Sequence, residues 1–151
     1  MSAASKRHSD PALLDLPFSY PIRVYWEDTD AGGVVYHAQY LCFLERASTE
    51  WVRAMGVHQQ SLRDSDDLVL AVREMNIDFL KPARLDDLLQ ATVLLTMRRS
   101  ASFTVAQELF RDDQCLLRAQ MRIACLHAST FKPRPLPKWM LANPIPGEPS
   151  R

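Results

Sequence analysis

Residues 24–51 read VYWEDTDAGGVVYHAQYLCFLERASTEW, and this stretch decides the fold. Its second half repeats apolar side chains every three or four residues, which is typical of an α-helix with one buried face. The apolar positions are Tyr36, Tyr40, Phe43, Leu44, Ala47, Trp51, Ala54 and Met55. Polar residues such as Glu45 and Thr49 fill the other face, and Gly56 is placed to end the helix. The pattern predicts a helix over residues 36–55.

Strand patterns flank this helix on both sides. Residues 20–26 and 68–80 alternate apolar and polar side chains, as half-buried strands do. Three further apolar segments, separated by short polar turns, are residues 88–97, 101–110 and 116–126. Short connections favour antiparallel pairing, so we expect one strand, the long helix and then four strands in a meander. Residues 58–65 are expected to form a short second helix or a loop. The fold class is α+β, with one long helix on an antiparallel sheet of about five strands.

Length and charge indicate a single globular domain. The chain has 151 residues, of which 47% are hydrophobic, enough for a sizeable core and too few for two full domains. The longest uncharged run, residues 31–44, is shorter than the roughly 20 residues of a membrane span. The formal charge is zero, which argues against a nucleic-acid binder. Residues 1–97 carry 9 basic and 14 acidic side chains (−5), whereas residues 98–151 carry 9 and 4 (+5). An anionic partner is therefore expected to meet the C-terminal half.

The two ends differ in composition from the middle. Residues 1–17 lack the apolar stretch of a signal peptide and are expected to form a flexible arm. Six of the ten prolines lie between Pro133 and Pro149, so residues 132–151 are expected to be an extended or disordered tail. Residues 18–131 remain as the folded domain. Three cysteines, an odd number without a CxxC pair, indicate a reducing cytoplasm, no disulfide and no metal site.

The joint between the first strand and the helix holds the residues suited to chemistry. A helix N-terminus carries unpaired N–H groups and a partial positive charge, which stabilise an oxyanion forming on a carbonyl. Asp30 precedes it on a loop made pliable by Gly32 and Gly33, two of only four glycines. Such a carboxylate acts as a nucleophile or as a general base on water. A structural role is the alternative, and for Asp28 helix capping or surface solvation is the preferred interpretation.

The same residues resemble a known family. The motif Asp28-Thr29-Asp30, a glycine, Val-Val-Tyr36-His37 and Tyr40 is similar to that of the 4-hydroxybenzoyl-CoA thioesterase-type hotdog proteins. Within them it looks most like the YbgC-like acyl-CoA thioesterases associated with the Tol–Pal system. The resemblance implies a hotdog fold and hydrolysis of acyl-CoA to a free acid and CoA, without a cofactor. It assigns catalysis to Asp30 and polarisation of the thioester carbonyl to the backbone N–H groups around Tyr36 and His37.

Three details qualify that assignment. The His37 side chain is expected to add a hydrogen bond or to orient Asp30 or water, with simple packing as the alternative. Tyr36 lies on the apolar stripe of the predicted helix, so packing in the core is the alternative to a catalytic role for its side chain. Trp26 replaces a tyrosine that is common in the family, and its indole N–H donates a hydrogen bond but accepts none.

Basic side chains of the C-terminal half are candidates for the phosphates of coenzyme A. The candidate residues are Arg98, Arg99, Ser100, Ser102, Lys132, Arg134 and Lys138. Each has the alternative of being an ordinary solvated surface group or turn residue. The resemblance further implies a homodimer or homotetramer with the active site between subunits, so these residues are expected to serve the partner's Asp30. Acyl carrier protein is an alternative carrier.

Two other functions stay open at this stage. One is a hotdog dehydratase or hydratase. The other is a non-enzymatic acyl-binding or scaffolding protein of the envelope or lipid-synthesis machinery, which docks through its proline-rich tail. The sequence leaves the acyl group undetermined and does not separate a nucleophilic Asp30 from a general base.

Overall fold

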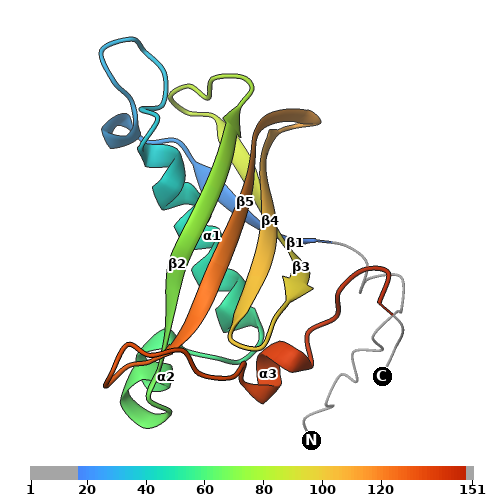
Figure 1. Ribbon diagram of the computed structural model, residues 1–151. Helices are drawn as coiled ribbons and strands as arrows, with labels where there is room; N and C mark the ends of the chain where they lie inside the picture. Colours follow the sequence, from blue (N-terminus) through green and yellow to red (C-terminus); the bar gives the residue numbers. More distant parts are fainter. Residues whose placement is uncertain (1–16, 149–151) are drawn as a thin grey trace, which may run out of the picture.

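A five-stranded antiparallel sheet curves around one long helix in the computed structural model, which describes residues 17–148 (Figure 1). The strands are β1 (Phe18–Arg23), β2 (Leu68–Phe79), β3 (Leu88–Arg98), β4 (Ser102–Arg111) and β5 (Gln114–His127). The helices are the 3₁₀ turn η2 (Trp26–Asp28), α1 (Gln39–Ala54), α2 (Gln59–Ser65) and α3 (Lys138–Leu141). The predicted α+β class is therefore confirmed, and residues 58–65 contain a helix. No helix in this part of the chain is long and apolar enough to span a membrane.

The sheet order is β1-β3-β4-β5-β2, so the predicted four-strand meander is wrong. Only β3, β4 and β5 follow one another, and β2 pairs with β5 at the far edge. The loop 80–87 explains the difference. The N–H groups of Leu80 and Lys81 both donate to the carbonyl of Leu116, so the chain crosses the start of β5 instead of turning back. Pro82 in this loop lacks the N–H that a ladder needs.

Helix α1 covers the concave face of the sheet with its apolar side (Figure 1). Its buried residues are Tyr40, Phe43, Leu44, Ala47, Ser48, Trp51 and Val52. The amide of Gln107, fully buried on β4, donates a 3.0 Å hydrogen bond to the Leu44 carbonyl and ties helix to sheet. Gly56 follows the helix with φ of +81°, as predicted for a C-terminal stop. The helix begins at Gln39, three residues later than its apolar period predicts.

The C-terminal segment is packed over the described residues up to 148, in contrast to the expected extended tail. Leu136, Met140 and Ile145 are buried, and Met140 has no exposed surface. Residues 138–141 form α3, and the side chain of Arg98 donates a hydrogen bond to the Met140 carbonyl. The prolines therefore do not prevent these three apolar side chains from being buried against the domain. The predicted arm, residues 1–17, lies outside the described residues except for Pro17.

Candidate active site

The loop between β1 and α1 is a small hairpin with Asp30 at its base, at the upper left of Figure 1. Thr29 and Val35 form an antiparallel bridge, and the Asp30 N–H donates to the Val34 carbonyl over 3.0 Å. Gly33 has φ of +76°, a conformation that residues with a side chain rarely adopt. The glycines therefore allow a tight turn, and the turn fixes where Asp30 stands.

The Asp30 carboxylate is exposed and held by one oxygen. Its Oδ1 accepts a 2.8 Å hydrogen bond from the Gly32 N–H. Its Oδ2 accepts no hydrogen bond from any residue between 17 and 148. A carboxylate anchored at one oxygen and open at the other is suited to attack a carbonyl or to take a proton from water.

Asp28 stabilises the same loop from its buried side. Only 1% of its surface is exposed, which excludes the solvated-surface interpretation. Its Oδ2 accepts a 2.7 Å hydrogen bond from the Tyr25 N–H, and its carbonyl accepts one of 2.9 Å from the Tyr36 N–H. Asp28 thus caps the 3₁₀ turn η2, whereas the expected capping of the long helix is not observed, because α1 begins after Ala38 without a side-chain cap from the described residues. The Asp28 carbonyl also occupies the Tyr36 N–H.

This changes the expected oxyanion-binding group. Because the Tyr36 N–H is already bonded and α1 starts at Gln39, Tyr36 is not a free helix-terminal donor. Neither the His37 N–H nor the Ala38 N–H has an acceptor among the described residues, so both are available donors, and that of His37 lies nearer in the chain to Asp30. The two side chains are exposed and their rings lie 4.6 Å apart between centroids. Tyr36 is therefore not a core residue, and no hydrogen bond joins the described side chains of His37 and Asp30.

Tyr40 connects the Asp30 loop to the crossing loop 80–87. Its hydroxyl accepts a 2.9 Å hydrogen bond from the Ala83 N–H, and the Ala83 carbonyl accepts one of 2.9 Å from the Val35 N–H. Burial of this ring, which contacts Phe79 with centroids 5.7 Å apart, raises the pKa of the Tyr40 hydroxyl. The sequence predicts Tyr40 as an apolar position and as part of the motif without a role for its hydroxyl, whereas in the structure the hydroxyl positions the loop.

Two of the predicted phosphate-binding residues have structural partners instead. Arg98 donates to the Met140 carbonyl and forms an ion pair of 2.9 Å with Glu148. Arg134 donates to the carbonyls of Asp66 and Asp67. Both guanidinium groups hold the C-terminal segment and the start of β2 in place, so they are poorly suited to bind a ligand.

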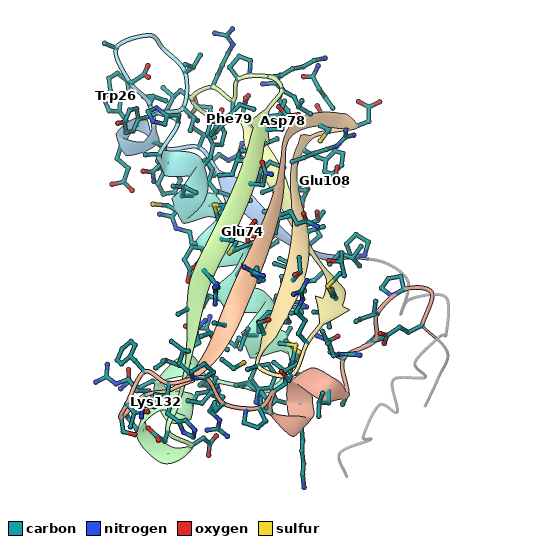
Figure 2. The ribbon with its side chains drawn as sticks, in the orientation of Figure 1. Trp26, Glu74, Asp78, Phe79, Glu108 and Lys132 are labelled. Carbon is teal, nitrogen blue, oxygen red and sulfur yellow. The ribbon has the colours of Figure 1, made fainter. Side chains whose placement is uncertain are left out.

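The other candidates, most of which are exposed, lie at the end of the sheet opposite Asp30. Arg99, Ser100, Lys132 and Lys138 are exposed, and Ser102 is partly buried. Figure 2 shows Lys132 near α2, at the end of the molecule opposite Trp26, which precedes Asp30 by four residues. Within one chain, the structure does not bring the basic residues and Asp30 together.

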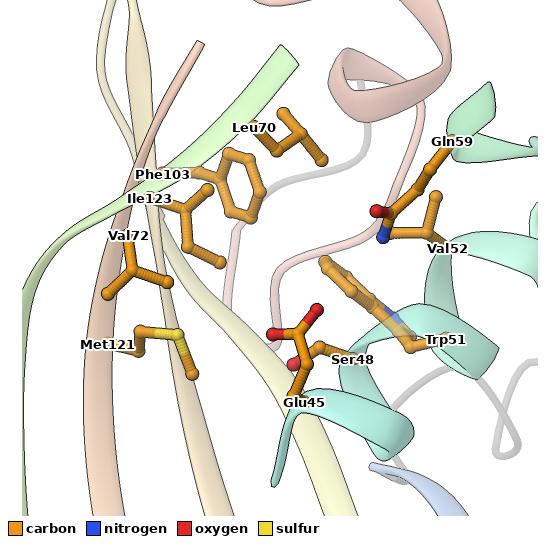
Figure 3. Close-up of a pocket in the computed structure, with 10 residues that line it drawn as sticks. All are labelled: Glu45, Ser48, Trp51, Val52, Gln59, Leu70, Val72, Phe103, Met121 and Ile123. Atoms are coloured by element: carbon orange, nitrogen blue, oxygen red, sulfur yellow. The ribbon is translucent and has the colours of Figure 1, made fainter. Parts of the chain in front are cut away.

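A small cavity between α1 and the sheet was not predicted (Figure 3). Glu45 and Ser48 reach it from one side of the helix, and Leu70 and Val72 reach it from β2. Although Glu45 as a residue is exposed, desolvation of its carboxyl raises its pKa. The signal in the sequence was the spacing of three between Glu45 and Ser48, which puts both on the same side of a helix.

Comparison with known proteins identifies related sequences. Residues 24–143 match the model of the thioesterase-like superfamily. The acyl-CoA thioesterase YbgC of Haemophilus influenzae is 43% identical over 126 residues, covering 83% of this chain and 93% of its own. The acyl-CoA thioester hydrolase YbgC of Escherichia coli O157:H7 is 42% identical over 127 residues, covering 83% and 94%.

Solved structures agree with the fold. A probable thioesterase from Bartonella henselae is 35% identical with a TM-score of 0.78, covering 81% of this chain and all of its own. A 1,4-dihydroxy-2-naphthoyl-CoA thioesterase from Synechocystis is 29% identical with a TM-score of 0.79, covering 85% and 95%. The predicted hotdog fold is confirmed.

Proposed function

The chain belongs to the thioesterase-like superfamily, and we propose that it is an acyl-CoA thioester hydrolase in which Asp30 carries the reaction. Relatives named acyl-CoA thioesterase share 42–43% of the aligned residues over most of the chain, which supports the activity. The observation that supports Asp30 is its carboxylate, whose Oδ2 has no hydrogen-bond partner among residues 17–148 and which lies on the same short loop as the His37 N–H, likewise without an acceptor in that range.

As a general base, Asp30 takes a proton from water while the water oxygen attacks the thioester carbonyl carbon. The His37 N–H donates to the oxyanion that forms. Collapse of this intermediate breaks the C–S bond, and the CoA thiolate leaves and takes up a proton. As a nucleophile, Oδ2 itself attacks and the C–S bond breaks to give a mixed anhydride, which water then hydrolyses.

Substitution of Asp30 tests the proposal. Asp30→Asn and Asp30→Ala are expected to fold normally and to lower kcat on acyl-CoA by about 100-fold or more. Thiol release from a panel of acyl-CoA esters is the measurement, and Asp64→Asn on α2 is the matched control with unchanged turnover. Full turnover by either Asp30 variant would remove the assignment. Label in the Asp30 carboxylate after single turnover in ¹⁸O-water would identify the anhydride route, because water that attacks the Asp30 carbonyl carbon of the anhydride leaves its oxygen there, whereas the general-base route labels only the product acid.

The side chains of His37 and Tyr36 have supporting roles in this proposal. The His37 imidazole orients water or substrate, and its backbone N–H, which substitution retains, binds the oxyanion. His37→Ala is then expected to lower kcat only about tenfold, far less than Asp30→Asn. Tyr36 contributes an exposed ring beside the thioester, so Tyr36→Phe is expected to leave kcat nearly unchanged.

A second copy completes the site in this proposal. The β1 edge is short and contains Pro21, whereas the β2 edge runs over 12 residues without proline. Two β2 strands paired antiparallel about a two-fold axis bring the Phe79 end of one copy to the Leu68 end of the other. Asp30 of one subunit then lies near the cavity and the basic residues Arg99 and Lys132 of its partner. Light scattering tests the dimer, or the homotetramer built from it.

The carrier and the cellular setting rest on the resemblance alone. Coenzyme A is the proposed carrier, and parallel assays with acyl-CoA and acyl carrier protein thioesters decide between the two. Cell fractionation tests the proposed cytoplasmic location, and co-purification with Tol–Pal proteins tests that association. Turnover of a saturated acyl-CoA would exclude a purely scaffolding function. Conversion of a 3-hydroxyacyl thioester into the enoyl product would identify a dehydratase.

A further inference from the structure

The crossing loop 80–87 lies between the Asp30 loop and the turn that joins β4 to β5, at the upper end of the molecule in Figure 1. Strand β4 ends at Arg111, next to this loop. Ala83 in the crossing loop has no exposed surface, whereas Pro82 and Arg84 on either side of it are exposed. The loop is therefore packed into the domain at Ala83.

The peptide group between Pro82 and Ala83 is hydrogen-bonded at both of its polar atoms. Its N–H donates to the Tyr40 hydroxyl on α1 over 2.9 Å. Its carbonyl, which belongs to Pro82, accepts a longer hydrogen bond of 3.3 Å from Nη1 of Arg111 on β4. Because the N–H and C=O of a trans peptide point in opposite directions, the helix and the sheet hold this peptide plane from opposite sides.

The carbonyl of Ala83 connects this peptide to the Asp30 loop. It accepts a 2.9 Å hydrogen bond from the Val35 N–H. Val35 follows Val34, whose carbonyl accepts the Asp30 N–H, and precedes His37 by two residues. A rotation of the peptide between Pro82 and Ala83 would therefore move Val35 and change the distance between Asp30 and the His37 N–H.

Arg111 is itself held in one orientation. Its Nη1 forms a 2.7 Å ion pair with Oδ2 of Asp87, and its Nη2 donates a 2.7 Å hydrogen bond to Oε1 of Gln114. The same Asp87 oxygen accepts the Arg84 N–H over 2.9 Å, which ties the ion pair to the backbone of the crossing loop. The two side chains of the ion pair are only 29% and 20% exposed, so solvent screens their attraction less than that of a surface pair.

We propose that Arg111 is a positioning residue for hydrolysis, which sets the distance between the Asp30 carboxylate and the His37 N–H through the peptide between Pro82 and Ala83. The inference rests on the proposed function, in which these two groups act on one thioester. Arg111 acts through the crossing loop and touches neither group. Because a displacement of about 1 Å costs roughly 100-fold in rate, the loss of this contact lowers kcat while KM is retained.

Substitution of Arg111 tests the proposal by kinetics on acyl-CoA. Arg111→Gln removes the charge and the reach of the guanidinium, so kcat is expected to fall about tenfold with KM changed less than twofold. Arg111→Lys keeps a cation that donates to Asp87 and to the Pro82 carbonyl, so kcat is expected to recover to within about threefold of the wild type. Arg118→Gln is the matched control with unchanged kcat, because Arg118 also forms an ion pair, with Glu108, but has no hydrogen bond to the crossing loop.

Amide NMR of the folded protein separates this inference from the proposed function and from a loss of stability. Arg111→Gln is expected to shift the Val35 amide proton upfield, because its hydrogen bond to the Ala83 carbonyl weakens, and to shift the His37 amide as well. The amide of Ala47, at the centre of α1, is the internal reference and is expected to stay in place. Arg111→Lys is expected to return both shifted resonances toward their wild-type positions.

These shifts would show the link from Arg111 to the Asp30 loop even in a protein that hydrolysed no acyl-CoA, in which case only the proposed function would fail. Unchanged Val35 and His37 resonances in Arg111→Gln would overturn the inference. So would wild-type kcat in Arg111→Gln alongside an inactive Asp30→Asn, or an equal loss of kcat in Arg111→Gln and Arg118→Gln.

Discussion

The backbone N–H of Gly32 donates a 2.8 Å hydrogen bond to Oδ1 of Asp30, two residues earlier. A Cβ atom built on Gly32 would lie 3.0 Å from that same oxygen. At position 32 glycine is required because a side chain would crowd the Asp30 carboxylate. At position 33 glycine is required because the backbone adopts a positive φ. Two adjacent glycines serve two different physical requirements of one carboxylate.

Gly32→Ala is the first prediction. The added methyl group pushes the Asp30 carboxylate a few tenths of an ångström or rotates it, and misplacement of a reacting group lowers the rate strongly. We expect kcat on acyl-CoA to fall about tenfold or more, with the free energy of unfolding changed by less than about 1 kcal/mol. Steady-state kinetics and urea unfolding provide the two readouts.

Gly56→Ala is the matched control for that prediction. Gly56 has φ of +81° after α1, away from Asp30, and has open space around its Cβ position. Alanine at such a φ costs roughly 1 kcal/mol of stability and leaves kcat unchanged. If Gly32→Ala behaved like Gly56→Ala, losing stability but not turnover, the clash with Asp30 would not matter to catalysis.

Tyr40→Phe is the second prediction. The substitution removes the acceptor for the Ala83 N–H in a buried position and leaves that donor unsatisfied. We expect the free energy of unfolding to fall by about 1–3 kcal/mol. Tyr25→Phe, at a residue that is 61% exposed, is expected to have almost no effect in the same urea titration. Equal stability of the two variants would show that water replaces the Tyr40 hydroxyl.

The local elements of the fold were predictable from the sequence because their signals are local. The apolar period of α1 and the alternation along the strands report which side of each element is buried. The helix start was misplaced because Tyr36 continues the period, although its N–H bonds the Asp28 carbonyl and its ring is exposed. Periodicity does not reveal which N–H groups are already bonded.

The arrangement in space needed information that no short stretch carries. Strand β2 pairs with β5, about 50 positions later in the chain. No sequence pattern in the loop 80–87 indicates which strand pairs with β2. Composition indicated an extended tail, but the burial of Met140 depends on Arg98 and on the sheet beneath it. The motif located Asp30 and His37, whereas the cavity at Ser48 arises only when α1 meets three strands.

The third prediction concerns the C-terminal segment. Met140 is completely buried, so Met140→Ala is expected to lower the free energy of unfolding by about 2–5 kcal/mol. Leu141→Ala, at a neighbouring residue that is 53% exposed, is expected to cost less than about 1 kcal/mol. Deletion of residues 139–151 is therefore expected to destabilise the domain, not merely to remove a docking tail. A deletion variant with the stability of the full chain would contradict this packing role.

The fourth prediction is a pH dependence caused by Cys125. This thiol has no exposed surface, and desolvation raises its pKa to about 11, with the nearby Arg134 guanidinium acting in the opposite direction. In the unfolded chain a cysteine has a pKa of about 8.5. Between these values the unfolded chain loses the proton while the folded chain keeps it. The free energy of unfolding therefore falls as the pH rises, by at most about 1.4 kcal/mol per pH unit from this group.

Urea unfolding at pH 7, 9 and 10.5 measures the Cys125 effect. Cys125→Ala is expected to be less stable at pH 7, because it leaves a small cavity, but to lose less stability than the wild type as the pH rises. Cys42→Ala serves as the control, because Cys42 is exposed on α1 and its removal leaves the wild-type slope. Parallel slopes for Cys125→Ala and the wild type would mean that Cys125 ionises as readily in the folded protein as in the unfolded chain.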